Sequence, residues 1–306
     1  MKLCVFIEMF AYLQTSLSAI RRESQFGVGH ALSWYASRLH LRFLKPHLQE
    51  PKPTPADLER PISVVVPASE KDADVLPACL EHAKKHLRNP VEAFWVVAPP
   101  SEKIAAIAAA YDVEYVSEDQ ILPVPARELK TRGWIIQQLI KINVARSIPT
   151  AHYLVLDSDT IFLQPQCFFS KGRSILRYSD QYELLYNPGL KAAIGHGRRF
   201  PVSFVTHHML MDTAIIEELI EFLEDRLMTP WWKAVTKIID QGHLISFSEF
   251  DLYGNFVMER PDKRCRYLLD YWRGIDSDKT HLASFLAGDL IVPQRSNTIS
   301  FHRHTQ

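Results

Sequence analysis

The chain has 306 residues, of which 47% are hydrophobic, enough for one large domain or two small ones with a sizeable core. It carries 35 basic and 35 acidic residues, so a broad basic surface for nucleic acid is not expected. The four cysteines, Cys4, Cys79, Cys167 and Cys265, lie far apart and form no Cys-x-x-Cys pair. They are typical of reduced thiols in a cytoplasmic protein and do not predict a zinc site.

Residues 1–22 show apolar side chains at helical spacing, which predicts an amphipathic helix. Glu8 and Gln14 interrupt the pattern as a membrane span, and it lacks the apolar core and cleavage site of a signal peptide. An aromatic and basic segment follows. Two interpretations stay open for residues 1–47: peripheral attachment to the cytosolic face of a membrane, or packing on the domain or on a second subunit in a homodimer.

A polar stretch rich in proline follows this segment, which predicts a semi-rigid linker. Its prolines are Pro46, Pro51, Pro53, Pro55 and Pro61. We therefore expect a helical extension with a linker over residues 1–60 and one main domain over residues 61–306.

The main domain begins with alternating strand and helix patterns. Apolar β-type runs at residues 62–69, 91–98 and 113–116 are separated by helical stretches with short connections. This order predicts right-handed crossovers and a largely parallel sheet flanked by helices. Ligands bind such sheets at the carboxyl ends of the strands.

The strongest motif lies in residues 153–163, where an apolar run leads into Asp157 and Asp159 and a second apolar run follows. The first run predicts a strand buried on both faces. Because side chains alternate along a strand, the two aspartates leave its end pointing the same way. Two adjacent carboxylates repel unless a cation lies between them, so the pair predicts a divalent metal ion. The alternative is a surface turn, since Asp-Ser-Asp is also favourable turn chemistry.

Residues 132–142 have the periodicity of an amphipathic helix that places four polar or aromatic side chains on one stripe. These are Trp134, Gln137, Gln138 and Lys141. Two interpretations stay open for this stripe: contact with a substrate beside the metal site, or exposure to solvent.

Three later segments carry further candidates. Residues 195–199 predict a flexible basic loop able to close over phosphates, and residues 202–212 predict a strand with His207 and His208 at its centre. We expect both histidines to contact an acceptor. Residues 247–256 place Glu249 and Asp251 at the start of a helix, with Ser248 as its cap.

The alternating β and α pattern, the Asp-x-Asp pair after a central strand, and a histidine near the C-terminus together resemble metal-dependent nucleotide-sugar glycosyltransferases of the GT-A fold. The resemblance covers residues 61–304. Segments 133–138 and 248–255 also resemble an uncharacterised bacterial family grouped with the glycosyltransferases. The resemblance implies a GT-A-like, Rossmann-like α/β fold with a mixed, mostly parallel sheet.

The resemblance also implies roles for individual residues. Asp159 would bind Mn²⁺ or Mg²⁺, Asp157 would face the ribose or the metal's waters, and His302 would complete the site, with His304 as second choice. Glu249 would act as base in an inverting reaction, with Asp251 in reserve. The donor would contact the end of the first strand and the helical stripe, comprising Pro67, Ala68, Ser69, Glu70, Trp134, Gln137, Gln138, Lys141 and Asp157.

The implied function is transfer of a sugar from a UDP- or GDP-linked donor to a hydroxyl of a glycan or lipid-linked glycan. The first alternative is a phosphatase of the haloacid dehalogenase type with Asp157 as nucleophile. Its motif usually lies near the start of the domain, and the Thr160-Ile161 pair here is an imperfect match. The second alternative is a non-catalytic scaffold docked on a membrane.

Overall fold

The computed structural model describes residues 52–129, 131–179, 186–198, 202–241, 247–293 and 296–302. The predicted N-terminal helices, the membrane contact over residues 1–47 and His304 lie outside these residues. Within the part of the chain that the structure describes, no helix combines the length and the apolar character needed to cross a bilayer.

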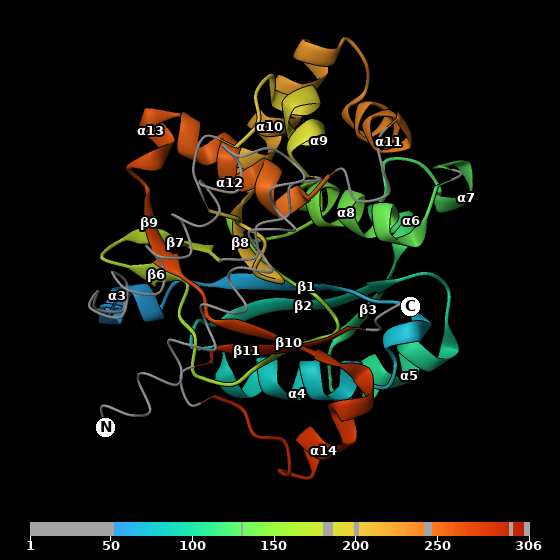
Figure 1. Cartoon of the computed structure of the whole chain (residues 1–306), viewed down its shortest axis with the longest axis vertical. Helices are drawn as coiled ribbons and strands as arrows, with labels where there is room; N and C mark the ends of the chain where they lie inside the picture. Colours follow the sequence, from blue (N-terminus) through green and yellow to red (C-terminus); the bar gives the residue numbers. More distant parts are fainter. Residues whose placement is uncertain are drawn as a thin grey trace, which may run out of the picture.

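A five-stranded sheet forms the centre of the molecule, in the order β3-β2-β1-β4-β8 (Figure 1). Its strands are β1 (Ile62–Pro67), β2 (Val91–Ala98), β3 (Glu114–Ser117), β4 (His152–Leu156) and β8 (His208–Asp212). The first four run parallel, and β8 is antiparallel to β4. The predicted mixed, mostly parallel sheet is confirmed.

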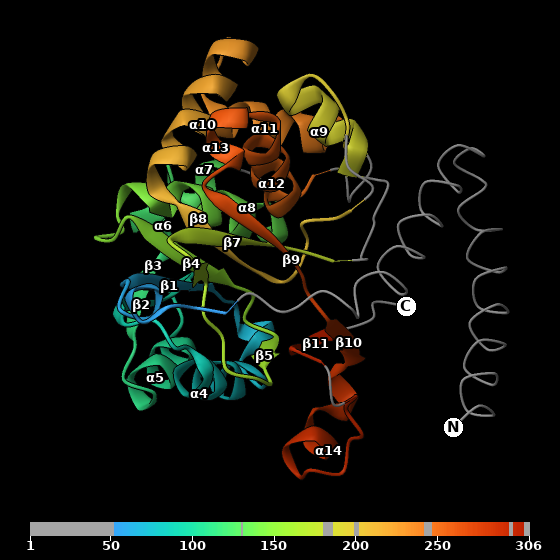
Figure 2. The same cartoon turned by 90° about the vertical axis from the view of Figure 1, so that its left-hand side faces the viewer.

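Helices cover both faces of this sheet, as Figures 1 and 2 show. α4 (Leu76–His86) and α5 (Glu102–Ala110) lie on one face, and α8 (Gly133–Asn143), α10 (Thr213–Leu227) and α12 (Glu249–Glu259) lie on the other. All six residues of β1 are buried because both of its faces are covered. Side chains alternate along a strand, so Val64 packs in the hydrophobic core on the α4 side of the sheet and Val65 packs in the core on the α8 side.

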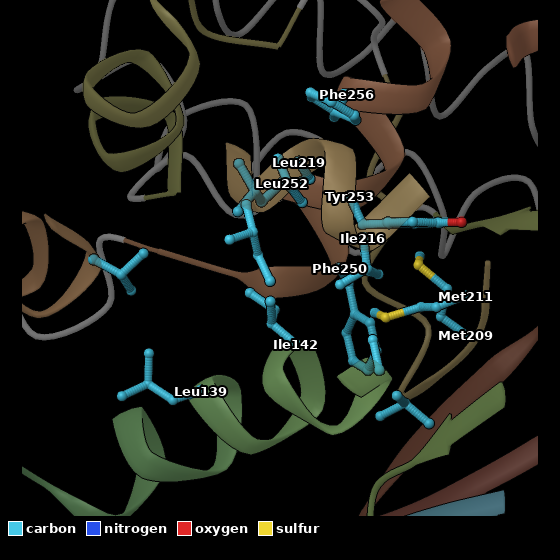
Figure 3. Close-up of a cluster of buried hydrophobic side chains, with 14 of the residues drawn as sticks. Leu139, Ile142, Met209, Met211, Ile216, Leu219, Phe250, Leu252, Tyr253 and Phe256 are labelled. Carbon is cyan, nitrogen blue, oxygen red and sulfur yellow. The ribbon is translucent and has the colours of Figure 1, made fainter. Parts of the chain in front are cut away.

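The core on the α8 side joins three helices to the sheet (Figure 3). Leu139 and Ile142 of α8 face Phe250 and Leu252 of α12, and Met209 of β8 lies beside Phe250. α10 adds Leu219 to the same cluster. All of these side chains are buried. This packing fixes the position of α8, so that its polar stripe lies next to the carboxyl end of β4.

The C-terminal strands form a second sheet in the order β10-β11-β5. β11 (Thr298–His302) pairs antiparallel with β5 (Thr160–Phe162) and parallel with β10 (Gly274–Asp278). β5 begins directly after Asp159, so this pairing brings the end of the chain back to the aspartate pair. A small separate core of Ile161, Ile299 and Phe301 stabilises the arrangement.

A third sheet packs beside β8 of the central sheet. Its strands are β6 (Phe169–Ser170), β7 (Arg173–Tyr178) and β9 (Tyr267–Tyr271). The remaining elements are short or peripheral. They are α3 (Pro55–Leu58), α6 (Glu118–Ile121), α7 (Ala126–Leu129), α9 (Tyr186–Ile194), α11 (Trp231–Gln241), α13 (Pro261–Arg264), α14 (Leu282–Leu286), and the 3-10 turns η4 (Glu70–Asp72), η5 (Val144–Arg146) and η6 (Lys279–His281).

Two stretches differ from their predicted structure. The end of the predicted linker folds as α3, where Thr54 caps the helix and Asp57 is buried against the β6–β7 turn. The predicted strand over residues 202–212 begins only at His208, because His207 adopts a left-handed backbone with φ of 58° that breaks the extended run. The boundary between an extension and a main domain at residue 61 stays a prediction.

Candidate active site

A cavity of about 490 Å³ lies at the carboxyl ends of β1 and β4, beneath α8 and beside the C-terminal sheet. It is lined by Pro67, Lys71, Asp72, Trp134, Gln137, Gln138, Lys141, Asp157, Ser158, Asp159, His207, Lys279 and His302. The lining is rich in titratable groups, which is typical of a catalytic or ligand-binding site. A wider depression of about 830 Å³ lies at the opposite end of β2, around Val91 and Glu114. Ligands bind parallel sheets at the carboxyl ends, so the smaller cavity is the candidate site.

Lys141 is a buried cation between two carboxylates. Its Nζ lies 2.6 Å from Asp157 Oδ1 and 2.5 Å from Glu249 Oε1. Burial alone would lower the pKa of Lys141, but the two carboxylates outweigh burial and raise it above its ordinary value. Lys141 is therefore charged and neutralises part of the negative charge beneath the cavity.

The two carboxylates that share Lys141 respond differently. Burial would raise the pKa of Asp157, but Lys141 and His207 outweigh it, so the pKa lies well below its usual range. Burial raises the pKa of Glu249, and Asp157 adds to the effect while Lys141 opposes it. Asp157 is therefore ionised at neutral pH.

Two histidines and two aspartates form a second cluster next to Asp157. His302 Nδ1 lies 2.9 Å from Asp159 Oδ2, and its Nε2 lies 3.3 Å from Asp276 Oδ1. His207 Nδ1 lies 3.2 Å from Asp157 Oδ2, and its Nε2 lies 3.7 Å from the same Asp276 oxygen. The two imidazole rings are 4.9 Å apart.

The electrostatics of this cluster favour a cation. Burial would lower the pKa of His302, but its hydrogen bonds to Asp159 and Asp276 raise it to about 10. A position where carboxylates hold a proton so strongly also attracts a metal ion. One ligand atom from each of His207, Asp276 and His302 can be chosen so that all three lie within 4.8 Å of one another. The residues present therefore fit a divalent metal.

The cavity wall opposite α8 is organised by Asp72. Asp72 is 4% exposed, and its carboxylate accepts hydrogen bonds from Ser69, Ser158 and Lys279 at 3.2, 3.2 and 3.0 Å. Ser158 stands between the two aspartates of the motif. Asp72 therefore links three segments of the cavity wall: the loop after β1 through Ser69, the aspartate motif through Ser158, and the turn η6 through Lys279.

The family model for a family of unknown function, DUF6492, matches residues 59–284. The chain belongs to this family. The match includes the aspartate motif and ends before β11, so His302 lies outside the matched residues. Among curated proteins, no sequence matches the chain.

Three solved glycosyltransferase structures are similar to this chain. Mouse xyloside xylosyltransferase 1 in its apo form is 9% identical, with a TM-score of 0.43 over 80% of this chain and 99% of that one. Glucosyl-3-phosphoglycerate synthase from Mycobacterium tuberculosis, with Mn²⁺, UDP and glucosyl-3-phosphoglycerate, is 18% identical, with a TM-score of 0.40 over 61% and 74%. Galactosyltransferase LgtC with donor and acceptor sugar analogues is 14% identical, with a TM-score of 0.38 over 80% and 88%.

In this DUF6492 chain, most of the residues singled out from sequence meet in the cavity. They are Pro67, Trp134, Gln137, Gln138, Lys141, Asp157, Asp159, His207 and His302. Three predicted donor contacts do not line it. Ala68 is buried, Ser69 donates to Asp72, and Glu70 accepts a 2.6 Å hydrogen bond from Ser101.

The predicted acceptor contact of His208 is corrected by the structure. His208 is fully buried, and its ring packs 4.1 Å from that of Trp272. Burial, together with the charge of Arg177, lowers its pKa to about 3. His207, whose left-handed backbone precedes the strand, lines the cavity, whereas His208 is the first residue of β8 and packs in the core.

Asp251 is also corrected. It is 1% exposed, forms an ion pair with Arg198 and accepts a 2.8 Å hydrogen bond from the backbone of Phe204. It lies outside the cavity lining and anchors the segment before β8, so it does not fit the reserve base. The side chain of Arg198 is correspondingly buried in this ion pair and is not free to close over phosphates as part of the predicted loop. Arg199 lies outside the described residues.

Glu249 lies in the first turn of α12, as predicted, with Ser248 as the cap. Its carboxylate contacts Lys141, and Gln138 Oε1 accepts from its backbone at 3.2 Å. Glu249 is 3% exposed and lies outside the cavity lining. Its contact with the cavity is therefore made through Lys141.

Sequence reasoning missed five residues of the site, namely Lys71, Asp72, Ser158, Asp276 and Lys279. Asp72 follows the predicted donor segment by two residues, and Asp276 lies in a Gly-Ile-Asp-Ser-Asp run. These acidic residues are visible in the sequence, but the sequence does not indicate which residues they contact. Only the pairing of β10 with β11 places Asp276 beside His302.

Proposed function

We propose that this chain is a divalent-metal-dependent glycosyltransferase that moves a sugar from a nucleotide-diphosphate donor to a hydroxyl acceptor. One observation carries the proposal. The Asp-x-Asp pair, two histidines and a buried lysine converge in a single cavity at the carboxyl ends of parallel strands. The motif and its place after a buried central strand are those of the GT-A glycosyltransferases that the sequence resembles.

The charges of the cavity suit departure of a diphosphate. A metal ion held by the aspartate and histidine cluster would stabilise the negative charge that develops on the leaving group. Lys71 is exposed beside the cavity and is free to face a phosphate, whereas Lys279 is paired with Asp72. Mn²⁺ and Mg²⁺ are the expected ions.

The α8 stripe is the proposed donor platform. Trp134 and Gln137 are half-buried at the cavity wall, so an aromatic face and an amide are available to a ribose or a sugar. Gln138 is buried, and its Nε2 has no hydrogen-bond partner among the described residues. A buried amide donor without a partner costs free energy unless a ligand or water accepts from it.

The inverting outcome expected from the resemblance depends on Glu249 as base. A positioning role is instead supported by the contact of Glu249 Oε1 with Lys141 and by the absence of Glu249 from the cavity lining. We propose that the acceptor is a hydroxyl of a glycan or lipid-linked glycan. We also propose that residues 1–47 contact a membrane.

A thermal-shift screen of UDP- and GDP-sugars with and without Mn²⁺ tests the proposal. A specific donor stabilises the fold by mass action, so one donor should raise Tm when Mn²⁺ is present and lose that effect with chelator. Release of nucleoside diphosphate from the same donor should follow the same metal dependence.

Asp159→Asn should abolish donor turnover while Tm without ligands stays close to wild type. Asp112→Asn is the matched control, because Asp112 is an exposed carboxylate in a left-handed turn that asparagine tolerates. Full turnover by Asp159→Asn in chelator-treated buffer would refute the proposal. Phosphate release from p-nitrophenyl phosphate would instead support the phosphatase alternative.

A further inference from the structure

The wider depression at the amino end of β2 forms a groove that has no part in the proposed function. Its volume is about 830 Å³, and it lies where β2 and β3 begin and where α4 and α5 end. β3 is an edge strand, so no other described strand pairs with its outer side. We propose that residues 38–45 of this chain occupy the groove when the protein is not bound to a membrane.

The groove exposes one end of a hydrophobic core. Six of its lining residues are apolar, namely Leu87, Val91, Ala93, Phe94, Ala109 and Val113. Three of them, Leu87, Phe94 and Val113, are only partly buried and pack against the core on the α4 side of the sheet. Val91 is 38% exposed. An apolar segment that covered this surface would be stabilised by removing it from water.

The charged residues of the groove are mainly acidic. Glu92, Asp112 and Glu114 are all exposed. Lys84 Nζ is the basic group of the lining, and it lies 2.9 Å from the carbonyl oxygen and 3.8 Å from the carboxylate of Asp112. Neither Glu92 nor Glu114 forms an ion pair with another described residue. The groove therefore attracts an occupant with basic side chains.

Residues 38–45 have the matching chemistry. They alternate basic and apolar side chains in the order Arg38, Leu39, His40, Leu41, Arg42 and Phe43, and end on Leu44 and Lys45. In an extended chain, this alternation places the apolar side chains on one face and the basic ones on the other. The apolar face covers the exposed core, and the long arginine side chains reach the acidic residues beside it.

The chain enters the described structure next to the groove. Asn89 lines the groove, and its Nδ2 donates to the carbonyl oxygens of Asp57 and Arg60 at 2.8 and 3.1 Å. Lys52, where the described residues begin, lies just before these two in sequence. The linker from Lys45 to Lys52 spans up to about 25 Å, because each extended residue covers about 3.3–3.6 Å. The segment therefore reaches the groove while every described element stays folded.

The tether favours this segment over a separate protein as the occupant. A tethered segment has an effective concentration far above that of a free partner. The inference does not rest on the proposed transferase activity. It describes the protein away from a membrane, because anionic lipid competes for the same basic side chains.

Hydrogen exchange of the full-length chain in solution tests this docking. In the wild type, residues 38–45 and the groove residues 91–94 should both exchange slowly. Arg38→Glu combined with Arg42→Glu turns attraction into repulsion. Exchange at both places should then rise at least about tenfold, while β1 keeps its protection.

Exchanging the charges provides the rescue. Glu92→Arg with Glu114→Arg should also expose the segment, and all four substitutions together should restore slow exchange, because opposite charges face each other again. Glu81→Arg with Glu128→Arg is the matched control, since both residues are exposed and lie outside the groove lining. This control should exchange as the wild type does.

Three results would overturn the inference. Equal exchange of the groove in the wild type and in Arg38→Glu with Arg42→Glu would show that the segment does not cover it. Protection that disappears on dilution would place the segment of one copy on the groove of another. Protection of residues 38–45 that requires vesicles containing phosphatidylserine would assign the segment to the membrane instead.

Discussion

Lys141 shows at the scale of one residue how burial and pairing combine. It is 6% exposed and holds two carboxylates within 2.6 Å of its ammonium. Removing one member of a buried ion network leaves the others uncompensated. The site therefore depends on this cation for stability as well as for its electrostatic potential.

Lys141→Met should lower the free energy of unfolding by about 3–5 kcal/mol, because Asp157 and Glu249 are left as unpaired buried carboxylates. Chemical denaturation measures the loss. The double variant Lys141→Met with Glu249→Gln should recover part of it, since one of the unpaired charges is removed. A single variant as stable as wild type would contradict the buried network.

Glu249→Gln tests whether this carboxylate positions Lys141 or removes a proton. For positioning, we expect kcat within about tenfold of wild type, a raised KM for the donor and a lower Tm. A general base would instead cost about a hundredfold or more in kcat and remove the acidic limb of the pH–rate profile. Steady-state kinetics from pH 5 to 9 distinguish the two roles.

At the scale of elements, α12 packs unusually closely against the segment before β8. A Cβ built on Gly254 would lie 2.2 Å from Phe204 Cγ, and Phe204 is itself 1% exposed. This close approach places the first turn of α12, and with it Glu249, over Lys141. Glycine is required here by space, because its φ is not in the left-handed range.

Gly254→Ala should therefore destabilise the protein by about 1–3 kcal/mol through overpacking, despite alanine's better helix propensity. Gly133→Ala is the control, because its added Cβ meets nothing within 4 Å, and it should be neutral or slightly stabilising. Both are measured by thermal and urea unfolding. Equal stability of the two variants would show that Phe204 yields readily.

Asp57 joins α3 to the β6–β7 turn. Its carboxylate accepts backbone hydrogen bonds from Thr54, Lys171 and Gly172 at 2.8, 2.7 and 2.9 Å. Burial would raise the pKa of Asp57, but these hydrogen bonds outweigh it and lower the pKa below its ordinary value. The ionised carboxylate therefore stabilises the fold.

Asp57→Asn should cost about 1–3 kcal/mol near pH 7, because the amide presents N–H where the backbone also donates. A depressed pKa gives stability that is full above the unfolded pKa of about 3.9 and is lost as pH falls through the folded pKa. The difference between wild type and variant should thus shrink below about pH 4. A difference that does not change with pH would contradict the ionised contact.

At the scale of the whole molecule, the C-terminal segment completes the site. β11 lies between β10 and β5 and brings His302 to Asp159, while Ile299 and Phe301 fill a small third core together with Val75 and Ala78 beside the sheet. The metal cluster therefore depends on a peripheral lobe, and loosening this lobe should weaken ion binding before the main sheet unfolds.

Phe301→Ala should destabilise this lobe by about 3–5 kcal/mol, because a fully buried aromatic side chain is removed. Mn²⁺ affinity should fall together with hydrogen-exchange protection of β11, while β1 and β4 keep theirs. Leu286→Ala is the control, since Leu286 is 59% exposed and its loss should cost less than about 0.5 kcal/mol. Unchanged protection of β11 in Phe301→Ala would contradict a separate lobe.

The sequence by itself determined the elements of the central sheet and half of the site. These features are local signals, because burial and periodicity are determined by residues close together in the sequence. They are the apolar run of β1, the amphipathic stripe of α8 and the aspartate pair after β4. That is why α8, its stripe and the position of Asp157 and Asp159 agree with the structure. The choice of His302 also relied on the family resemblance.

Only the tertiary structure decided which charges meet. Asp276 reaches His302 through the pairing of β10 with β11, and Asp72 reaches Lys279 across 207 residues of chain. The side of the chain to which His207 and His208 each point depends on a left-handed residue that no periodicity shows. Burial of Glu249 likewise follows from the packing of α12 on α8. These features arise from contacts distant in sequence, where ion pairs and strand register are selected by three-dimensional packing and not by local propensity.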